Sequence, residues 1–452
     1  MKTGKLFLLL ILTFFLFSCN LLTNPGEQVD IQAIVSGTLT ALPQALQDIT
    51  PPPVESEPTV IPLASPTESQ KSNELRVVFI GPDRNLQTWT ESTGPTSILE
   101  FGDISEFKIS TDGELVAFLR QDASISSSLW VSGFNGNNPR QVMSWDDLKG
   151  LKTSPDSYGA SPSNLQWIPG THRFTFTTHD LFEGPGLILN DDLIEVDADT
   201  GAWRICLQRG DGGIVKYSPD GKWMTVSTAN RVIIRDINGN TSPTAPLSFT
   251  PVMTYSEYQY YPEPVWAADG SWLAVAIPPN DPLAEPKQAF SIWTMDTSGG
   301  APVLESQVVP QFLGPVSISP DLQKYYYVKE TGQPVENKRE IRTAQINGQN
   351  EQVVFTGGIP IMHDWNSDSE SFAYQAASQL TVTVNQLNGP PANLAGTDGT
   401  FWFRWVDETR FLFARRAGDT MEILLGKQGE GSRLLAALPT SDMFFLEIDF
   451  IR

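Results

Sequence analysis

From residue 75 onward, short apolar segments alternate with tight polar turns. Seven stretches share one pattern, in which a turn rich in Asp and Gly separates two strand-like runs. These stretches begin at residues 107, 165, 215, 264, 316, 363 and 403, so successive starts are 58, 50, 49, 52, 47 and 40 residues apart. A period of this length is typical of the blades of a β-propeller.

The turn is clearest in residues 215–226, VKYSPDGKWMTV. Pro219 fixes φ, Asp220 can hydrogen-bond to its own backbone, and Gly221 can adopt the left-handed conformation that closes a tight hairpin. Some repeats lack the glycine: Leu322 takes its place in one, and residues 366–369 and 406–409 keep only an acidic residue. We expect those turns to close differently.

A second strand pair with a central Gly-containing turn follows each stretch, so each repeat supplies four antiparallel strands. Residues 75–100 supply three further strands, and residues 445–451 supply one. Joined, they complete an eighth blade and remove the exposed sheet edges. The sequence therefore predicts an all-β propeller over residues 75–452, with eight four-stranded blades and a first blade closed by the C-terminal strand. Seven blades with an irregular N-terminal strand is the alternative.

Trp266 with Asp269-Gly270, followed by Ile292-Trp293 and Gly299-Gly300, resembles the repeat of TolB-type, WD-repeat-like propellers. This resemblance extends over residues 75–452 and implies an extracytoplasmic propeller, with a role as a subunit of an envelope assembly as one possible function. TolB carries an additional N-terminal α/β domain. Residues 20–74 are too short and too poor in hydrophobic residues to form such a domain.

The first 18 residues have the features of a secretory signal. Lys2 and Lys5 precede an apolar run over residues 6–17, which as a helix would span only about 18 Å of a ~30 Å hydrocarbon layer. The run ends in Leu16-Phe17-Ser18-Cys19, which resembles the bacterial lipobox, and this implies lipidation of Cys19. An ordinary signal peptide with a chance cysteine is the alternative. We expect an extracytoplasmic protein anchored to a bacterial membrane, at the cell surface or in the periplasm.

Residues 19–74 are predicted to connect this anchor to the propeller. Apolar residues at helical spacing over residues 27–49 indicate at best a short amphipathic helix, because Gly37 and Pro43 interrupt it. Residues 50–73 contain six prolines and no aromatic residue, which is typical of a linker.

Charge and composition exclude several functions. The net charge of −22 argues against nucleic acid as a partner. Besides Cys19 there is only Cys206, in an apolar strand where we expect a buried small hydrophobe, so no cysteine-based metal or cofactor site is predicted. The three histidines, His172, His179 and His363, have no ligand spacing, and no G-x-S-x-G elbow occurs. We therefore predict no catalytic residue, no metal and no cofactor.

Long connections indicate where binding takes place. Residues 145–164, 178–191, 248–263, 277–289 and 329–339 form long connections, which we assign to one face of blades 2 to 5. The centre of the predicted site is residues 255–263, here called the tyrosine segment. Its candidate ligand-binding residues, with two acidic residues of the blade 3 loop, are Tyr255, Glu257, Tyr258, Tyr260, Tyr261, Glu263, Asp180 and Glu183.

Tyrosine offers apolar area, a hydroxyl group and little rotamer entropy to lose, which suits a binding surface. With Asp281 and Glu285 at the rim, the segment would suit a sugar or a basic peptide. The alternative is that Tyr258 and Tyr260 fold back as a plug over the channel. The predicted function is thus a binding or scaffolding module for protein or glycan ligands. A carbohydrate-active hydrolase or lyase is the second hypothesis, which three carboxylates converging on the central funnel would favour.

Overall fold

The computed structural model describes residues 74–121, 126–184, 188–310, 316–331, 338–376, 380–439 and 446–452. The chain divides into two compact units, Met1–Glu68 and Ser69–Arg452, and the second unit contains all of the described residues. The predicted signal, Cys19 and the amphipathic and proline-rich segments therefore all lie outside the described residues.

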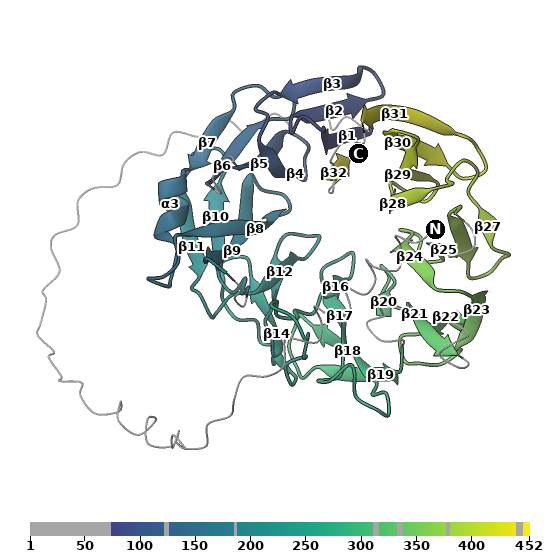
Figure 1. The fold of residues 1–452 in the computed structure, drawn as a ribbon. Helices are drawn as coiled ribbons and strands as arrows, with labels where there is room; N and C mark the ends of the chain where they lie inside the picture. Colours follow the sequence, from purple (N-terminus) through teal and green to yellow (C-terminus); the bar gives the residue numbers. More distant parts are fainter. Residues whose placement is uncertain are drawn as a thin grey trace, which may run out of the picture. The chain divides into compact units, whose positions relative to one another are not determined.

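Eight four-stranded antiparallel sheets form the second unit, and they are arranged as blades around a common centre (Figure 1). From the centre outward, the strands of blades 1 to 4 are β32 (Ile448–Ile451), β1 (Arg76–Ile80), β2 (Leu86–Thr90), β3 (Gly94–Leu99); β4 (Ile104–Ile109), β5 (Leu115–Gln121), β6 (Ser127–Gly133), β7 (Arg140–Met143); β8 (Gly159–Trp167), β9 (Arg173–Leu181), β10 (Leu193–Asp197), β11 (Trp203–Leu207); and β12 (Ile214–Tyr217), β13 (Trp223–Ser227), β14 (Arg231–Asp236), β15 (Leu247–Ser248).

The strands of blades 5 to 8 are β16 (Val265–Trp266), β17 (Trp272–Ile277), β18 (Phe290–Asp296), β19 (Val303–Val308); β20 (Val316–Ile318), β21 (Lys324–Thr331), β22 (Lys338–Gln345), β23 (Gln352–Gly357); β24 (Pro360–Trp365), β25 (Ser371–Ala376), β26 (Thr383–Gln386), β27 (Ala392–Asn393); and β28 (Thr400–Trp405), β29 (Arg410–Ala417), β30 (Thr420–Lys427), β31 (Ser432–Pro439). One helix, α3 (Trp145–Gly150), lies between blades 2 and 3. In the described part of the chain, no helix combines the length and apolar character that crossing a bilayer requires.

The predicted closure of the ring is confirmed. The C-terminal strand β32 pairs antiparallel with β1, with Val77 opposite Phe450 and Val78 opposite Asp449. Leu446, Ile448 and Phe450 pack against the core between blades 8 and 1, whereas Ile451 packs against the core between blades 1 and 2. The closing strand therefore joins both neighbours of blade 1, and the propeller has eight blades rather than seven.

The recurring aspartate fixes the turn between the first and second strands. In five blades the residue two positions before the aspartate accepts a hydrogen bond from the residue after it, and the aspartate carboxylate accepts one from the backbone two residues on. Leu322 and Ser369 occupy the left-handed position in blades 6 and 7, with φ of 58° in each case. The expectation that these two turns close differently was therefore wrong, because the surrounding bonds hold a non-glycine residue in the same conformation.

In blade 8 the turn does close differently. The amide of Val406 donates to the carbonyl of Arg410 at 2.9 Å, so the hairpin is one residue shorter than in the other blades. The Asp407 carboxylate accepts hydrogen bonds from the amides of Thr409 and Arg410. Both kinds of turn have one feature in common, an aspartate whose carboxylate accepts hydrogen bonds from backbone amides that follow it.

Tryptophan side chains link the first strands of neighbouring blades. The indole nitrogens of four tryptophans each donate to a carbonyl in the first strand of the preceding blade, at 2.9–3.2 Å. These tryptophans are Trp167, Trp266, Trp365 and Trp405. A buried indole N–H needs such a partner, so the tryptophan of the repeat both packs and joins adjacent blades.

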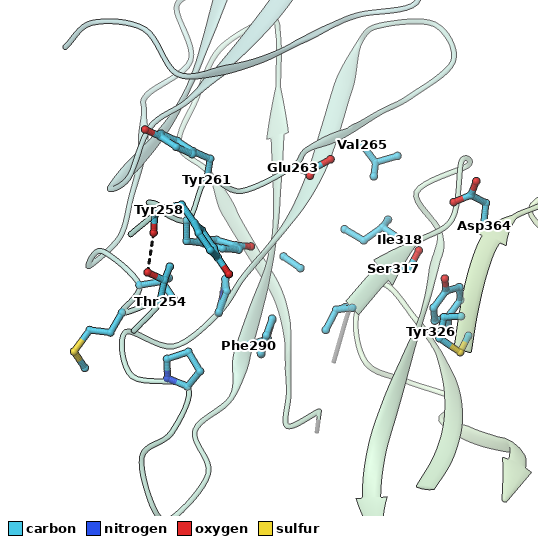
Figure 2. A pocket seen from close by; sticks show the side chains of 18 of the residues that line it. Thr254, Tyr258, Tyr261, Glu263, Val265, Phe290, Ser317, Ile318, Tyr326 and Asp364 are labelled. Atoms are coloured by element: carbon cyan, nitrogen blue, oxygen red, sulfur yellow. Dashed lines mark hydrogen bonds between the residues drawn. The ribbon is translucent and has the colours of Figure 1, made fainter. Parts of the chain in front are cut away.

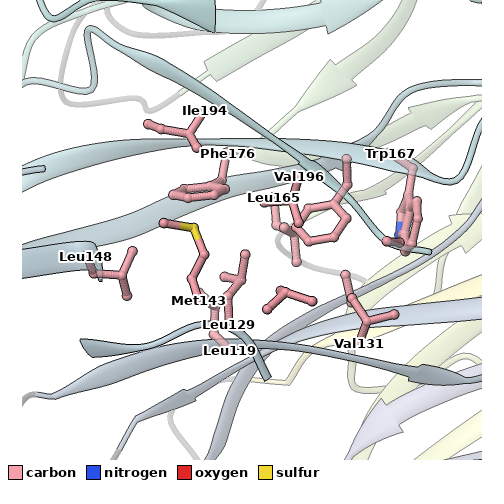
Figure 3. Close-up of a cluster of buried hydrophobic side chains, with 14 residues drawn as sticks. Leu119, Leu129, Val131, Met143, Leu148, Leu165, Trp167, Phe176, Ile194 and Val196 are labelled. Carbon is pink, nitrogen blue, oxygen red and sulfur yellow. The ribbon is translucent and has the colours of Figure 1, made fainter. Parts of the chain in front are cut away.

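The hydrophobic core lies between the blades. Between blades 2 and 3, Leu119, Leu129 and Val131 of one sheet face Phe176 and Ile194 of the next (Figure 3). Leu148 of helix α3 covers the edge of the same cluster. Because each sheet is covered on both faces, its central strands are apolar almost throughout.

Candidate functional site

The long connections either join the second and third strands of a blade or join one blade to the next. Both kinds leave the sheets on the same side of the propeller, which we call the loop face. Four of the five fall in blades 2 to 5, as predicted. The fifth, residues 329–339, joins β21 to β22 and belongs to blade 6, and both of its described ends continue these strands. The assignment of that connection to blades 2 to 5 was wrong, because it counted one repeat too few.

The tyrosine segment runs between β15 and β16 and is attached to its neighbours by hydrogen bonds. The amide of Ile188, in the β9–β10 connection, donates to the carbonyl of Glu257 at 2.8 Å. The hydroxyl of Tyr255 donates to a carboxylate oxygen of Asp281 at 2.8 Å. Thr254 donates to the carbonyl of Tyr258 at 2.7 Å. The segment is therefore fixed to the loops of blades 3 and 5 on both sides.

Four of the predicted site residues line one cavity, of about 640 Å³, which we call the seam cavity (Figure 2). These residues are Tyr258, Tyr260, Tyr261 and Glu263. Cavities of this size are typical of ligand sites in proteins. The opposite wall comes from blades 6 and 7, which contribute Ile318, Tyr326 and Asp364 among others. Sequence reasoning missed this wall.

The three tyrosines that the tyrosine segment contributes to the cavity have different environments. Tyr258 is 59% exposed. Burial raises the pKa of Tyr260 well above its usual value, so its hydroxyl stays protonated. Burial also raises the pKa of Tyr261, although a hydrogen bond with the backbone of Asn190 opposes this, and its hydroxyl points away from Val265 and Ile318 (Figure 2). Tyr261 thus ties the segment to blade 3, while Tyr258 remains open to solvent.

The remaining predicted residues lie elsewhere on the loop face. Asp180 accepts hydrogen bonds from the amides of Thr153 and Ser154, and its side chain is only 8% exposed. It therefore holds the connection between blades 2 and 3. Glu183 is exposed, and Glu285 forms an ion pair with Lys287 at 2.9 Å.

Large apolar side chains are exposed over the same sector, each at least 39% accessible. We call them the exposed apolar patch: Tyr158, Phe182, Ile188, Met253, Tyr255, Tyr258 and Leu283. Hydrogen bonds connect their segments, since Tyr158 donates to the carbonyl of Phe182 at 2.9 Å and Met253 donates to the carbonyl of Asn280 at 2.8 Å. Clustered apolar exposure of this kind marks interaction sites.

The seam cavity opens where lateral bonding between first strands is interrupted. At the neighbouring junctions Trp266 donates to Lys216 and Trp365 donates to Ser317. Within the described residues, no hydrogen bond or ion pair joins β16 to β20, although Ser306 Oγ donates to the carbonyl of Ile346 farther out. Val265 of β16 and Ile318 of β20 both line the cavity, which therefore lies between two first strands that no described hydrogen bond joins.

The lining of the seam cavity carries two carboxylates and no Lys or Arg. Glu263 pairs with Lys216 at 3.4 Å, and Asp364 pairs with Arg404 at 3.4 Å. Each side chain remains more than half exposed, and neither carboxylate accepts a hydrogen bond within the described residues. Burial is the main reason that the pKa of His363, which also lines the cavity, is lowered, so this imidazole is neutral at pH 7.

A second cluster lies around His172, in the turn between β8 and β9. Its Nε2 is 2.9 Å from Asp112 and its Nδ1 is 3.0 Å from Asp199. Ligand atoms of Asp112, Glu114 and His172 all lie within 4.8 Å of one another, a spacing that a divalent cation can bridge. Sequence spacing concealed this proximity, because Asp112 and His172 are 60 residues apart and meet only when blades 2 and 3 pack together.

A third group lies in the first strands of blades 1 and 2. Burial, assisted by the charge of Glu106, raises the pKa of Glu447 to about 7, against the opposing effect of Lys108. Glu106 accepts a hydrogen bond from the Leu165 amide at 3.2 Å, and Asp449 accepts one from the Ile109 amide at 3.1 Å. These carboxylates join the first strands of blades 1, 2 and 3.

Cys206 is only half-buried, because β11 is the outer strand of blade 3. Burial, with the nearby Glu195 carboxylate, raises the pKa of its thiol to about 11. A thiol with this pKa is a poor nucleophile at neutral pH.

No protein-family model matches the sequence, and no curated protein matches it. Solved structures do match. A eukaryotic initiation factor has a TM-score of 0.51 at 12% identity, with 82% of this chain and 86% of that chain covered. TolB from Acinetobacter baumannii has a TM-score of 0.31 at 16% identity, over 63% of each chain. A prolyl endopeptidase has a TM-score of 0.46 at 12% identity, over 77% of this chain and 50% of that chain. At such identities the likeness concerns the β-propeller fold alone.

Proposed function

We propose that this protein is a lipid-anchored, extracytoplasmic binding module whose ligand, a protein or a glycan, docks on the loop face of blades 3 to 5. The membrane is its second partner, through a lipid on Cys19. The anchoring part of the proposal rests on the sequence of residues 1–19 alone.

The exposed apolar patch is the observation that carries the binding part. It combines Tyr255 and Tyr258, the most exposed of its members, with other apolar side chains, and the exposed Glu257 lies between these two tyrosines in the sequence. Tyrosine is enriched in binding surfaces because it supplies a large rigid area and a hydroxyl group at little entropic cost. The patch adjoins the seam cavity, since Met253 and Tyr258 belong to both.

The carboxylates in and next to the first strands of blades 1 and 2 have structural roles, which favours the binding hypothesis over the hydrolase or lyase hypothesis. Glu106 and Asp449 accept backbone hydrogen bonds from neighbouring blades, and Glu447 is paired with Lys108 at 3.3 Å. Such bonds give these residues a structural role without a substrate. The hydrolase or lyase hypothesis needs carboxylates that remain available to a glycosidic bond.

A paired-variant experiment tests the binding proposal. Tyr255→Ala with Tyr258→Ala removes the two most exposed rings, whereas Val303→Ala with Leu304→Ala removes comparable exposed side chains from outer strand β19. Cross-linked envelope components bound to the full-length chain are quantified by mass spectrometry, alongside a glycan array. We expect the loop-face pair to lose at least 10-fold in captured ligand and the β19 pair to retain it. Equal capture by both pairs would contradict the proposal.

Anchoring is tested separately by Cys19→Ser. Labelling with a fatty-acid probe should mark the wild type and not the variant, and the variant should appear in the soluble fraction. Equal labelling of the two proteins would disprove lipidation at Cys19.

A further inference from the structure

We infer that the seam cavity binds a cationic side chain, a lysine or arginine presented by an extended peptide segment of a protein partner. This inference rests on the proposed binding function and specifies the chemistry of its ligand. It uses residues of blades 6 and 7 that the tyrosine segment alone does not include.

The charges around the cavity favour a cation. Glu263 and Asp364 are the charged residues of its lining, and both carry carboxylates. Each forms an ion pair with a basic residue outside the lining, Lys216 or Arg404. Neither carboxylate accepts a hydrogen bond in the described part of the chain, and both side chains are more than half exposed. Such carboxylates can accept the N–H groups of a guanidinium or an ammonium.

The walls of the cavity suit the apolar stem of such a side chain. Val265, Phe290 and Ile318 line the cavity between its two ends, and Tyr326 lies on the side of blade 7 (Figure 2). Lysine and arginine place their methylene stems on apolar surface while their charged ends meet polar groups. The exposed ring of Tyr258 adds an aromatic face, and such faces attract cations within about 6 Å of the ring.

The same features disfavour other ligands. Phosphate or carboxylate groups would meet two carboxylates and no basic residue in the lining. The hydroxyl of Tyr326 is already used, since it donates to the carbonyl of His363 at 2.6 Å. A neutral sugar could stack on Tyr258 and donate its hydroxyl groups to the same carboxylates, so the charge requirement tested below distinguishes a cationic side chain from a sugar.

The place of the cavity explains how a peptide reaches it. The exposed apolar patch runs up to the cavity mouth at Met253 and Tyr258. A segment docked on the patch can therefore insert one long side chain at the gap between β16 and β20. Apolar side chains on either side of the inserted residue would remain on the patch.

Matched peptides test the charge requirement. The probes are Ac-Leu-Arg-Phe-NH2 and the same peptide with citrulline, which keeps the shape of arginine and removes its charge. Binding to the full-length chain is measured by saturation-transfer NMR and titration. We expect the arginine peptide to bind at least 10-fold more tightly than the citrulline peptide.

Variants locate the site. Glu263→Gln with Asp364→Asn should weaken the arginine peptide at least 10-fold and leave the citrulline peptide unchanged. Glu100→Gln, an isosteric change of an exposed carboxylate of blade 1 outside both the cavity lining and the candidate binding residues, should change neither. Both single variants are measured as well, with melting curves, so that misfolding of the double variant is recognised.

Three outcomes would overturn the inference: equal binding of the two peptides, unchanged binding to the double and single variants, or no saturation transfer to the arginine peptide. A glycan that binds the wild type and is lost in the tyrosine variants would also overturn it, but would leave the proposed binding function standing. Loss of the binding function is shown separately by the capture experiment.

Discussion

Individual aspartates explain why the same turn returns along the chain. Asp112, Asp220 and Asp321 each accept a hydrogen bond from the hydroxyl of the serine two residues before and from the amide two residues after. Short acceptor side chains are favoured in tight turns for this reason. This role was predictable because it depends only on neighbours in sequence.

Contacts between blades were not predictable at the scale of residues. The indole of Trp266 was recognised as part of a repeat, but its acceptor, the carbonyl of Lys216, is 50 residues away. The same holds for His172, whose two acidic partners come from different blades. Such pairs depend on the rotation between adjacent sheets, which local pattern does not encode.

His172 makes stability depend on pH. Partial burial opposes its protonation, but hydrogen bonds and charge from Asp199 and Asp112 outweigh this and raise its pKa above the usual value. A raised pKa means that the added stability is fully present below the unfolded value of about 6.5 and is lost as pH rises through the folded value. We expect wild type to exceed His172→Gln in free energy of unfolding by about 0.5–1 kcal/mol at pH 5.5. The difference should vanish at pH 9.

Urea unfolding of both proteins at the two pH values measures this. A variant with the same deficit at pH 5.5 and pH 9 would show that the contacts of His172 act through packing rather than charge.

At the scale of elements, the first turns of blades 4 and 5 also pack against the turn of the preceding blade. A β-carbon added to Gly221 would lie 2.3 Å from the carbonyl oxygen of Pro169 in blade 3. Gly170, which takes the place of the aspartate in the turn of blade 3, also has a positive φ, of 74°, but nothing lies within 4 Å of its added β-carbon. Position 221 thus needs glycine both for its φ and for the close approach of Pro169, whereas position 170 needs it for its φ alone.

This difference gives a matched pair of variants. Gly170→Ala should cost only the strain of a left-handed residue, about 1–2 kcal/mol, and Gly221→Ala should cost clearly more because the backbone of Pro169 must move. Denaturant unfolding compares the two. An equal loss in the free energy of unfolding for the two variants would show that the turn at Gly221 does not pack against the turn of blade 3.

Strands were predictable as elements, and loops were not. The period-2 and apolar patterns located the four strands of every repeat because each strand's environment is uniform along its length. The connection over residues 145–164 contains helix α3, with a capping box at Ser144 and Asp147, and the beginning of β8. Because only the length of this connection was considered, it was predicted to be a loop throughout.

At the scale of the whole molecule, the C-terminal strand holds the ring closed. Deleting residues 444–452 removes β32 with Leu446, Ile448, Phe450 and Ile451; Phe444 and Phe445 lie outside the described residues. Each large apolar side chain contributes about 1.5–3 kcal/mol when fully buried. These four are partly buried, so we expect a loss of roughly 5 kcal/mol, comparable with the total stability of many proteins.

Calorimetry of the truncated chain measures this, and a chain that lacks only Arg452 is the control. The control should melt like the wild type. A truncated chain that melts cooperatively near the wild-type temperature would show that ring closure contributes little.

The eight-blade ring was predictable because it depends on counting strands at the two ends of one chain. The seam cavity was not, because its walls come from three blades that are far apart in the sequence. Tyr258 and Glu263 were identified from composition, whereas Asp364 lies about 100 residues farther along the chain and had no local signal.

Site-specific photo-cross-linking tests the central claim, that the loop face is a binding surface, most directly. p-Benzoylphenylalanine replaces Tyr258 in the full-length protein in cells, and in a control it replaces Leu304, which is similarly exposed on β19. We predict a cross-linked adduct from position 258, none from position 304, and a weaker one when Glu263→Gln and Asp364→Asn are added. No adduct at position 258, or equal adducts at both positions, would contradict the claim.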